Sequence, residues 1–206
     1  MEASFAQSVL KLYLNRQLEV LLVLLKEKIV IVISGPAGSG KTTYAKRLAE
    51  KLGLRYFSAG NIFRKIAKEK GLSLVELSKL AEKDYSIDLE IDRRTFEEAR
   101  KGNVVIDGHL TAWIVKELAD VAIYITAPLM VRVKRIAERD NKPLREAYYE
   151  TVRREFSQRK RFLEIYGIDV TDTSWFDLII NTEKYTIDEV YEIIEKAILK
   201  ALGKEA

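Results

Sequence analysis

The sequence predicts an α/β fold with a mostly parallel β-sheet, and three observations support this prediction. Short apolar runs alternate with longer amphipathic segments along most of the 206 residues. The first run, residues 29–33, is β-branched and apolar at every position, as in a strand buried on both faces. A glycine-rich turn and a helical pattern follow it, which is the order of a βα unit. We therefore expect a three-layer α/β/α domain with right-handed crossovers.

The composition narrows the functional classes. The chain is 48% hydrophobic, with 35 basic against 31 acidic residues and a net charge of +4, which suits one domain with a mildly basic surface. It has no cysteine and one histidine, so disulfide scaffolds, cysteine-ligated metals, thiol catalysis and multi-histidine sites are excluded. No apolar run approaches the roughly 18 residues of a membrane span, and the first residues, Met1 and Glu2, form no basic signal-peptide start. We expect a cytoplasmic protein.

The first 27 residues stand apart from this pattern. Leu10, Leu14, Leu18 and Leu22 recur every four residues, which favours an amphipathic helix. Three interpretations remain open: a helix packed on the outside of the domain, a dimer contact, or a helix lying on a membrane surface. We expect a monomer, with a dimer through residues 1–27 as the alternative.

The elements after the glycine-rich turn can be placed from their end signals. Apolar spacing predicts a helix over 41–52, stopped by Gly53, and a short strand over 55–58. A helix follows Asn61, a capping box at Ser73 and Glu76 begins another, and a charged helix over 88–101 ends at Gly102.

The second half repeats the alternation. Buried strands are predicted over 104–107, 121–125 and 176–180. Two arginine-rich helices, 129–140 and 144–165, are separated by Asn141, Lys142 and Pro143. A capping box at Thr186 and Glu189 begins a final helix that runs to about residue 202.

The glycine-rich turn carries the strongest chemical signal. Residues 35–42 read GPAGSGKT, a full match to G-x-x-x-x-G-K-[ST]. Glycine lets several backbone N–H groups converge on one phosphate, and the following helix presents its positive end there. Lys41 can reach the β- and γ-phosphates, and the Thr42 hydroxyl can bind Mg²⁺. A chance glycine turn is the alternative, but the strand before it and the helix after it favour a nucleoside triphosphate site. Its expected residues are Gly35, Pro36, Ala37, Gly38, Ser39, Gly40, Lys41, Thr42 and Thr43.

Asp107 is the candidate second Mg²⁺ ligand. It ends a buried strand, where a carboxylate points into the crevice in which such sheets bind ligands. The alternative is an ordinary turn aspartate before Gly108. Among triphosphate-binding classes, the guanine signature N-K-x-D is missing, since residues 181–184 read NTEK. ATPases of the ABC and AAA+ types need longer chains, whereas a small-molecule kinase fits this length.

The arginines suit phosphoryl transfer, in which positive charge must surround the moving group. Arg64 opens a helix, Arg132, Arg135 and Arg139 follow helical spacing, and Arg154 and Arg161 lie two turns apart on one face. The break between the two arginine-rich helices predicts a lid that closes over the phosphates. One alternative is a solvated basic face paired with glutamates. Another is an RNA-binding surface, for which Phe156 and Phe162 are interleaved with basic residues, although a net charge of +4 argues against it.

Several further segments carry a family resemblance. They are SAGNIFR at 58–64, VIDGHLTAW at 105–113, the helical segment from Arg154–Glu155 through Lys160–Phe162, and YGID at 166–169. Together with the glycine-rich loop they make the chain, over about residues 28–200, similar to the archaeal-type cytidylate kinases, a branch of the nucleoside monophosphate kinases.

The resemblance implies a P-loop kinase fold with two extra regions. Residues 28–206 would form the nucleoside monophosphate kinase domain, with a helical NMP-binding insertion at about 60–101 and a short LID at about 132–161. The activity implied is transfer of a phosphoryl group from ATP, with Mg²⁺, to CMP or dCMP. The partners implied are these small molecules only, with no membrane and no nucleic acid.

The resemblance also implies residue roles. Lys41, Arg64, Arg154 and Arg161 would be catalytic, and Thr42 and Asp107 would hold Mg²⁺. Arg135 and Arg139 would lie near ATP. The monophosphate site would include Ser58, Arg64, Asp88, Arg93, Gly108, His109, Arg154 and Arg161, with Asp88 and Arg93 on the nucleobase side.

His109 departs from the family pattern. Many monophosphate kinases carry an arginine after the glycine at this position, as a second phosphate clamp. A neutral imidazole donates only one hydrogen bond and has no permanent charge, so a turn residue and a phosphate contact are both open interpretations of His109. The alternatives for the whole chain are a kinase of AMP, UMP or shikimate, and a nucleotide-dependent RNA-binding module.

Overall fold

The structure is a computed structural model, and it describes residues 28–203. Its centre is a five-stranded sheet in the order β2-β3-β1-β4-β5, in which every neighbouring pair is parallel. The strands are β1 (Val30–Ser34), β2 (Arg55–Ser58), β3 (Val104–Gly108), β4 (Val121–Thr126) and β5 (Leu178–Asn181). The predictions for residues 1–27 lie outside the described residues.

The helices follow the predicted alternation closely. Their bounds are α2 (Lys41–Lys51), α3 (Ala59–Glu69), α4 (Leu74–Ala81), α5 (Ser86–Lys101), α6 (Thr111–Ile114), α7 (Leu129–Asp140), α8 (Leu144–Tyr166) and α9 (Ile187–Ala201), with a 3₁₀ turn at Lys116–Leu118. The capping boxes predicted before α4 and α9 are both formed, Ser73 with Glu76 and Thr186 with Glu189. No helix in residues 28–203 is long and apolar enough to cross a membrane.

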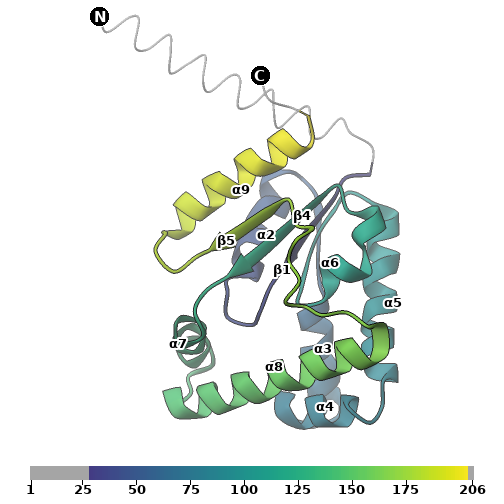
Figure 1. Ribbon diagram of the computed structural model, residues 1–206, viewed down its shortest axis with the longest axis vertical. Helices are drawn as coiled ribbons and strands as arrows, with labels where there is room; N and C mark the ends of the chain where they lie inside the picture. The colour runs from purple at the N-terminus through teal and green to yellow at the C-terminus, as the bar shows by residue number, and fades with distance from the viewer. Residues whose placement is uncertain (1–27, 204–206) are drawn as a thin grey trace, which may run out of the picture.

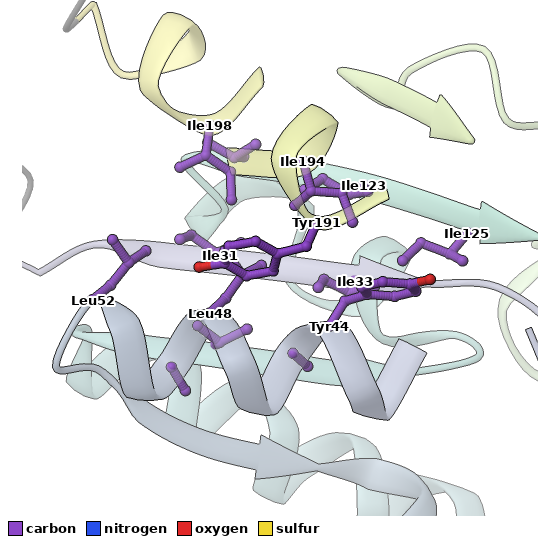
Figure 2. Close-up of a cluster of buried hydrophobic side chains, with 14 of the residues drawn as sticks. Ile31, Ile33, Tyr44, Leu48, Leu52, Ile123, Ile125, Tyr191, Ile194 and Ile198 are labelled. Carbon is purple, nitrogen blue, oxygen red and sulfur yellow. The ribbon is translucent and has the colours of Figure 1, made fainter. Parts of the chain in front are cut away.

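Two helical layers enclose the sheet, as predicted for an α/β/α domain. On one face, α2 and α9 pack against β1 and β4 (Figure 2), through a core that includes Ile31, Ile33, Leu48, Ile123 and Ile194. On the other face, α5 and α6 cover β1 and β3 through a second core, which includes Val32, Ile106, Ala99 and Ala112. The alternate side chains of β1 therefore face two cores, which explains why the whole strand is apolar.

The predicted NMP-binding insertion has a core of its own. Phe63 of α3, Leu77 and Ala81 of α4, and Ile87 and Ile91 of α5 form a buried cluster separate from the sheet. The same helix α5 continues into the second sheet core through Ala99, so it joins the insertion to the sheet. Figure 1 shows α3, α4, α7 and α8 gathered at one end of the molecule. This end is where the cavity described below lies.

Two details of the fold differ from the predictions. Helix α6 and the 3₁₀ turn were not predicted, because elements of 4 and 3 residues are too short to show a helical period. Strand β5 begins at Leu178 rather than at Phe176. The Phe176 ring instead stacks on Trp175 and meets Trp113 edge-on, with ring centroids 4.4 and 5.2 Å apart.

Candidate active site

The carboxyl ends of the strands bring the predicted site residues together. Ser34 pairs with Gly108 across β1 and β3, and Ser58 pairs with Asp107 across β2 and β3, so the loops after three strands begin at one edge. A cavity of about 1700 Å³ opens there. Its lining includes most of the predicted residues, namely Ala37, Gly38, Gly40, Lys41, Thr42, Thr43, Ser58, Arg64, Asp88, Asp107, Gly108, His109, Arg135, Arg139, Arg154 and Arg161.

The glycines of the loop are required by its close packing. Gly35 and Gly38 have φ of 139° and 78°, a region that side chains other than glycine rarely adopt. A Cβ on Gly35 would lie 2.0 Å from the Ile125 carbonyl oxygen, and one on Gly38 would lie 2.6 Å from that of Arg132. The loop is therefore packed closely against β4 and α7.

Arg132 of α7 supports this loop through hydrogen bonds. Its side chain is buried and donates to the carbonyl oxygens of Ala127 at 2.9 Å and Ala37 at 3.1 Å. Its other partner is the Glu155 carboxylate on α8. The arginine thus ties the loop to both helices of the predicted LID. Its helical spacing suggested that Arg132 covers the phosphates. Because its guanidinium is occupied by these partners within the protein, we instead assign it a structural role.

Three predicted loop residues, Gly35, Pro36 and Ser39, do not line the cavity; two of these support the loop through their carbonyl groups. The ammonium group of Lys41 donates to the Pro36 carbonyl at 2.7 Å, and the Thr182 hydroxyl donates to the Ser39 carbonyl at 3.2 Å. Burial lowers the pKa of Lys41 to about 8, although the nearby Asp107 carboxylate opposes the shift. A desolvated lysine of this kind gains most from an anion that enters the loop.

Asp107, the candidate magnesium ligand, lies at the end of β3 beside Thr42. It is buried, and its two carboxylate oxygens accept hydrogen bonds from the hydroxyls of Thr42 at 2.6 Å and Tyr56 at 3.1 Å. Burial and the Asp107 charge raise the pKa of Tyr56 to about 12, so the phenol stays a donor. No group of three or more histidine or acidic side chains forms a metal site within residues 28–203. A hydroxyl beside one carboxylate nevertheless fits Mg²⁺, which keeps waters and phosphate oxygens as its other ligands.

The cavity also contains an arginine with few partners. The Arg154 side chain is 12% exposed, and one of its terminal nitrogens lies 3.7 Å from a Glu150 oxygen. Its Nε has no hydrogen-bond partner among the described residues. Burial lowers the pKa of Arg154, and the neighbouring cations Arg64 and Arg139 add to the shift. A buried cation in this state favours an incoming anion.

Three more of the predicted arginines have partners. Arg135 donates to the side chain and the carbonyl of Thr182, at 2.9 and 3.0 Å. Arg139 forms a two-point ion pair with Asp140, at 2.7 and 2.8 Å. Arg64 donates to the Asn61 side chain at 2.6 Å. All three line the cavity.

Two predictions differ from the structure. Arg161 was expected to contact phosphate, but its side chain is fully buried and binds Asp88 at 2.6 and 3.2 Å and the Ser157 hydroxyl at 2.7 Å. These bonds use most of its N–H donors, so the arginine holds α8 against α5. Arg93 was expected beside the nucleobase, but it is not part of the cavity lining; it pairs with Glu90 and Glu97 on the exposed face of α5.

His109 and Ser58 each have a local partner at the cavity wall. The imidazole Nδ1 of His109 lies 2.9 Å from the Gln158 amide oxygen, and its ring meets Phe162 edge-on. Burial lowers the pKa of His109 to about 4, and Lys41, Arg132 and Arg154 add to the shift. The imidazole is therefore neutral at physiological pH. The Ser58 hydroxyl caps α3 by accepting a hydrogen bond from the Asn61 N–H at 3.3 Å.

Sequence reasoning missed several residues of the site. Tyr56 contacts Asp107 from the neighbouring strand, and Glu155 pairs with Arg132. Asp92 also lines the cavity, and it accepts a hydrogen bond from Tyr166. A signal existed for Asp92, since it lies four residues after Asp88 and hence on the same helical face. No local pattern marks Tyr56 or Glu155, because their partners are distant in sequence.

Comparison with known proteins is consistent with this geometry. The family model described as cytidylate kinase-like family matches residues 30–184. A protein of Staphylothermus marinus named cytidylate kinase is 62% identical over 84% of this chain and 98% of its own length. One of Desulfurococcus amylolyticus with the same name is 58% identical over 85% of this chain and 95% of its own.

Solved structures agree on the fold. Shikimate kinase from Acinetobacter baumannii superposes with a TM-score of 0.57 at 18% identity, over 84% of this chain and 94% of that one. The likeness supports the predicted P-loop kinase architecture. From the family model and from the identity to its curated relatives, the chain belongs to the cytidylate kinase-like family.

Proposed function

We propose that the protein is a cytidylate kinase, which transfers the γ-phosphoryl group of ATP to CMP or dCMP to form ADP and the diphosphate. The observation that carries this proposal is the underpartnered Arg154, which lines one cavity with Lys41, Arg64 and the loop glycines. Such a concentration of positive charge, in which Lys41 and Arg154 are desolvated, fits the phosphates of two nucleotides better than a neutral ligand. Family membership and the relatives named cytidylate kinase support the same substrate pair.

The triphosphate binds at the loop end of the cavity. The backbone N–H groups of residues 35–42 and the start of α2 surround its β-phosphate, and Lys41 extends toward the β- and γ-phosphates. Thr42 and Asp107 are the residues that would hold Mg²⁺. When bound, this ion neutralises charge on the β- and γ-phosphates.

The acceptor phosphate binds between the loop and the arginines. Arg64 holds the CMP phosphate, and Arg154 stabilises the charge that spreads over the transferred group in the transition state. The acceptor is a phosphate oxygen that is ionised at neutral pH, so no general base is required. The single N–H of the neutral His109 is donated to the Gln158 amide oxygen, so the phosphate charge is left to the two arginines.

The regional division is part of the proposal. The helices within 60–101 receive the monophosphate, and the segment 132–161 covers the phosphates. Because Arg132 anchors the start of this segment to the loop, we expect the movable portion to be the end of α7 from Arg139 and the turn at 141–143. Closure there would bring Arg139 toward the triphosphate and exclude water.

A substrate panel tests the proposal. Purified protein is given ATP, Mg²⁺ and one acceptor at a time, namely CMP, dCMP, UMP, AMP or shikimate, and ADP release is measured by a coupled assay. We expect the highest kcat/KM with CMP or dCMP. Equal turnover of all acceptors, or none of CMP, contradicts the proposal. RNA binding that weakens steeply with salt, without ADP release, would instead support an RNA-binding module.

The variant Lys41→Ala provides the control for the panel. It should remove turnover with every acceptor while its thermal unfolding stays close to that of the wild type, because the desolvated ammonium group makes one hydrogen bond within residues 28–203, to the Pro36 carbonyl. Near-normal activity in this variant would exclude the assigned role of Lys41.

A further inference from the structure

The end of the cavity against α5 and the second half of α8 is acidic. Asp88 and Asp92 line it, one helical turn apart on α5. Their α8 partners, Arg161 and Tyr166, lie beyond Arg154, and the seven residues from Arg154 to Arg161 rise by about 10 Å. This rise is comparable to the length of a nucleoside monophosphate from its phosphorus to its base. Because carboxylates repel phosphates, this end suits the nucleoside rather than the phosphate of the acceptor.

Asp92 differs from Asp88 in having one carboxyl oxygen that makes no hydrogen bond within residues 28–203. Both oxygens of Asp88 accept from the Arg161 guanidinium. In Asp92, Oδ2 accepts from the Tyr166 hydroxyl at 2.7 Å, and Oδ1 makes no hydrogen bond within residues 28–203. The Tyr166 bond fixes the plane of the carboxyl group. One carboxyl oxygen is therefore held in place at the cavity wall as an acceptor.

The surroundings of Asp92 suit a flat, apolar ring with a polar edge. Phe63, Ile91, Leu110 and Phe162 line the same cavity. Burial raises the pKa of Asp92 to about 7; the Asp88 charge adds to the shift, whereas the Tyr166 hydrogen bond and Arg161 oppose it. A carboxylate that is desolvated this far gains from a donor on the ligand.

We propose that Asp92 selects cytosine over uracil by accepting a hydrogen bond from the exocyclic amino group, with Tyr166 as its positioning residue. This inference rests on the proposed function. The two bases differ at the 4-position, where cytosine has an N–H donor and uracil has a carbonyl acceptor. A fixed carboxylate oxygen attracts the donor and repels the acceptor.

The variant Asp92→Asn tests the proposal directly. The Tyr166 hydroxyl would donate to the amide oxygen, so that the NH₂ group faces the cavity as a donor. The kcat/KM ratio of CMP to UMP should fall by about 10- to 100-fold, and kcat/KM for UMP should rise. The double variant Asp92→Asn, Tyr166→Phe frees the amide to rotate, and its gain with UMP should be smaller.

The role of Tyr166 has a separate readout. In Tyr166→Phe the ionised carboxylate loses a donor, so the pKa of Asp92 rises further. The ratio of kcat/KM for CMP to kcat/KM for UMP should fall. The pH at which this ratio increases should be higher than in the wild type. The charged and titratable groups around Asp92 are Asp88, Arg161 and Tyr166, of which only Tyr166 is altered. A purely structural role of Tyr166 would leave the pH profile unmoved.

Glu97→Gln, on the exposed face of the same helix, is the matched control and should leave the ratio unchanged. The proposal is overturned if Asp92→Asn leaves the CMP-to-UMP ratio unchanged, or changes only the ratio of CMP to dCMP, which would indicate a sugar contact. If Asp92→Asn does not fold, an unaltered ratio and pH profile in Tyr166→Phe overturns it instead. A wild type that phosphorylates no nucleoside monophosphate contradicts the proposed function itself.

Discussion

Asp88 and Arg161 form a two-point ion pair, at 2.6 and 3.2 Å, between side chains that are 7% and 1% exposed. The pair joins α5 to α8, and the same guanidinium reaches the Ser157 hydroxyl and the Ser78 carbonyl. The helices that surround the acceptor end of the cavity are therefore linked at one buried arginine. Arg161 therefore holds these helices in position.

Removal of this arginine should destabilise the fold. Arg161→Met leaves the Asp88 carboxylate buried without its partner, and we expect the free energy of unfolding to fall by about 3–5 kcal/mol. Urea denaturation measures the change. The double variant Asp88→Leu, Arg161→Met should be less destabilised than the single one, and the exposed Arg159→Met should cost less than about 0.5 kcal/mol. A loss below 1 kcal/mol for Arg161→Met would mean that the pair is not structural.

Replacement of Arg154 should reduce catalysis rather than stability. Arg154→Met removes the charge proposed to face the transferred phosphoryl group, and kcat should fall by about 1000-fold. Its stability should be unchanged or slightly higher, because a desolvated cation with an unbonded Nε is lost. Steady-state kinetics and thermal unfolding together separate the two effects. The control is Arg159→Met on the same helix, and equal loss of activity in both variants would contradict the assignment.

The Asp107 carboxylate should determine the response to Mg²⁺. Asp107→Asn is expected to raise the Mg²⁺ concentration for half-maximal activity by about 10- to 100-fold. Tyr56→Phe removes one of the two hydrogen bonds to this carboxylate and should have a smaller effect in the same direction. Titration of activity with Mg²⁺ at saturating ATP measures both. An unchanged Mg²⁺ requirement in Asp107→Asn would remove the residue from the metal site.

The preference for CMP over UMP should depend on pH in the wild type. The pKa of Asp92 is about 7, so below that pH the carboxyl group carries a proton. A protonated Oδ1 at the 4-position donates to O4 of uracil, whereas an ionised Oδ1 at the same place accepts from the cytosine amino group and repels O4 of uracil. The kcat/KM ratio should therefore increase between pH 6 and pH 8. A flat or falling ratio over this interval contradicts the role assigned to Asp92.

Features with a local signal were predicted from the sequence. The loop at 35–42 carries its glycine requirement in its own residues, and the capping boxes at Ser73 and Thr186 lie within four positions of their partners. The parallel sheet and the place of Asp107 at its carboxyl edge followed from the alternation of elements, because parallel strands end at one edge. The short helix α6 was missed, since one turn has no period to detect.

The hydrogen-bond and ion-pair partners of the arginines could not be predicted from local sequence patterns. Arg132, Arg135, Arg139, Arg154 and Arg161 are similar in sequence terms, and all lie on the two predicted arginine-rich helices. Their roles separate through distant partners: Arg161 meets Asp88 over 73 positions, and Arg135 meets Thr182 over 47. Among the described residues, Arg139 pairs with its neighbour Asp140, and Arg154 lies near Glu150 on its own helix; neither has a distant partner there. Which partner each arginine meets depends on how the chain packs, and local sequence does not show it.

The link between Arg132 and the Ala37 carbonyl spans 95 positions of the chain, which has a consequence for the order of folding. The glycine-rich loop lies near the start of the domain, yet its brace comes from a helix made much later in synthesis. Contacts of such long range form slowly, since closure of the intervening chain must come first. During synthesis or refolding, the nucleotide site should therefore form only after α7 has been made, so that a product truncated before α7 would present the motif without its brace.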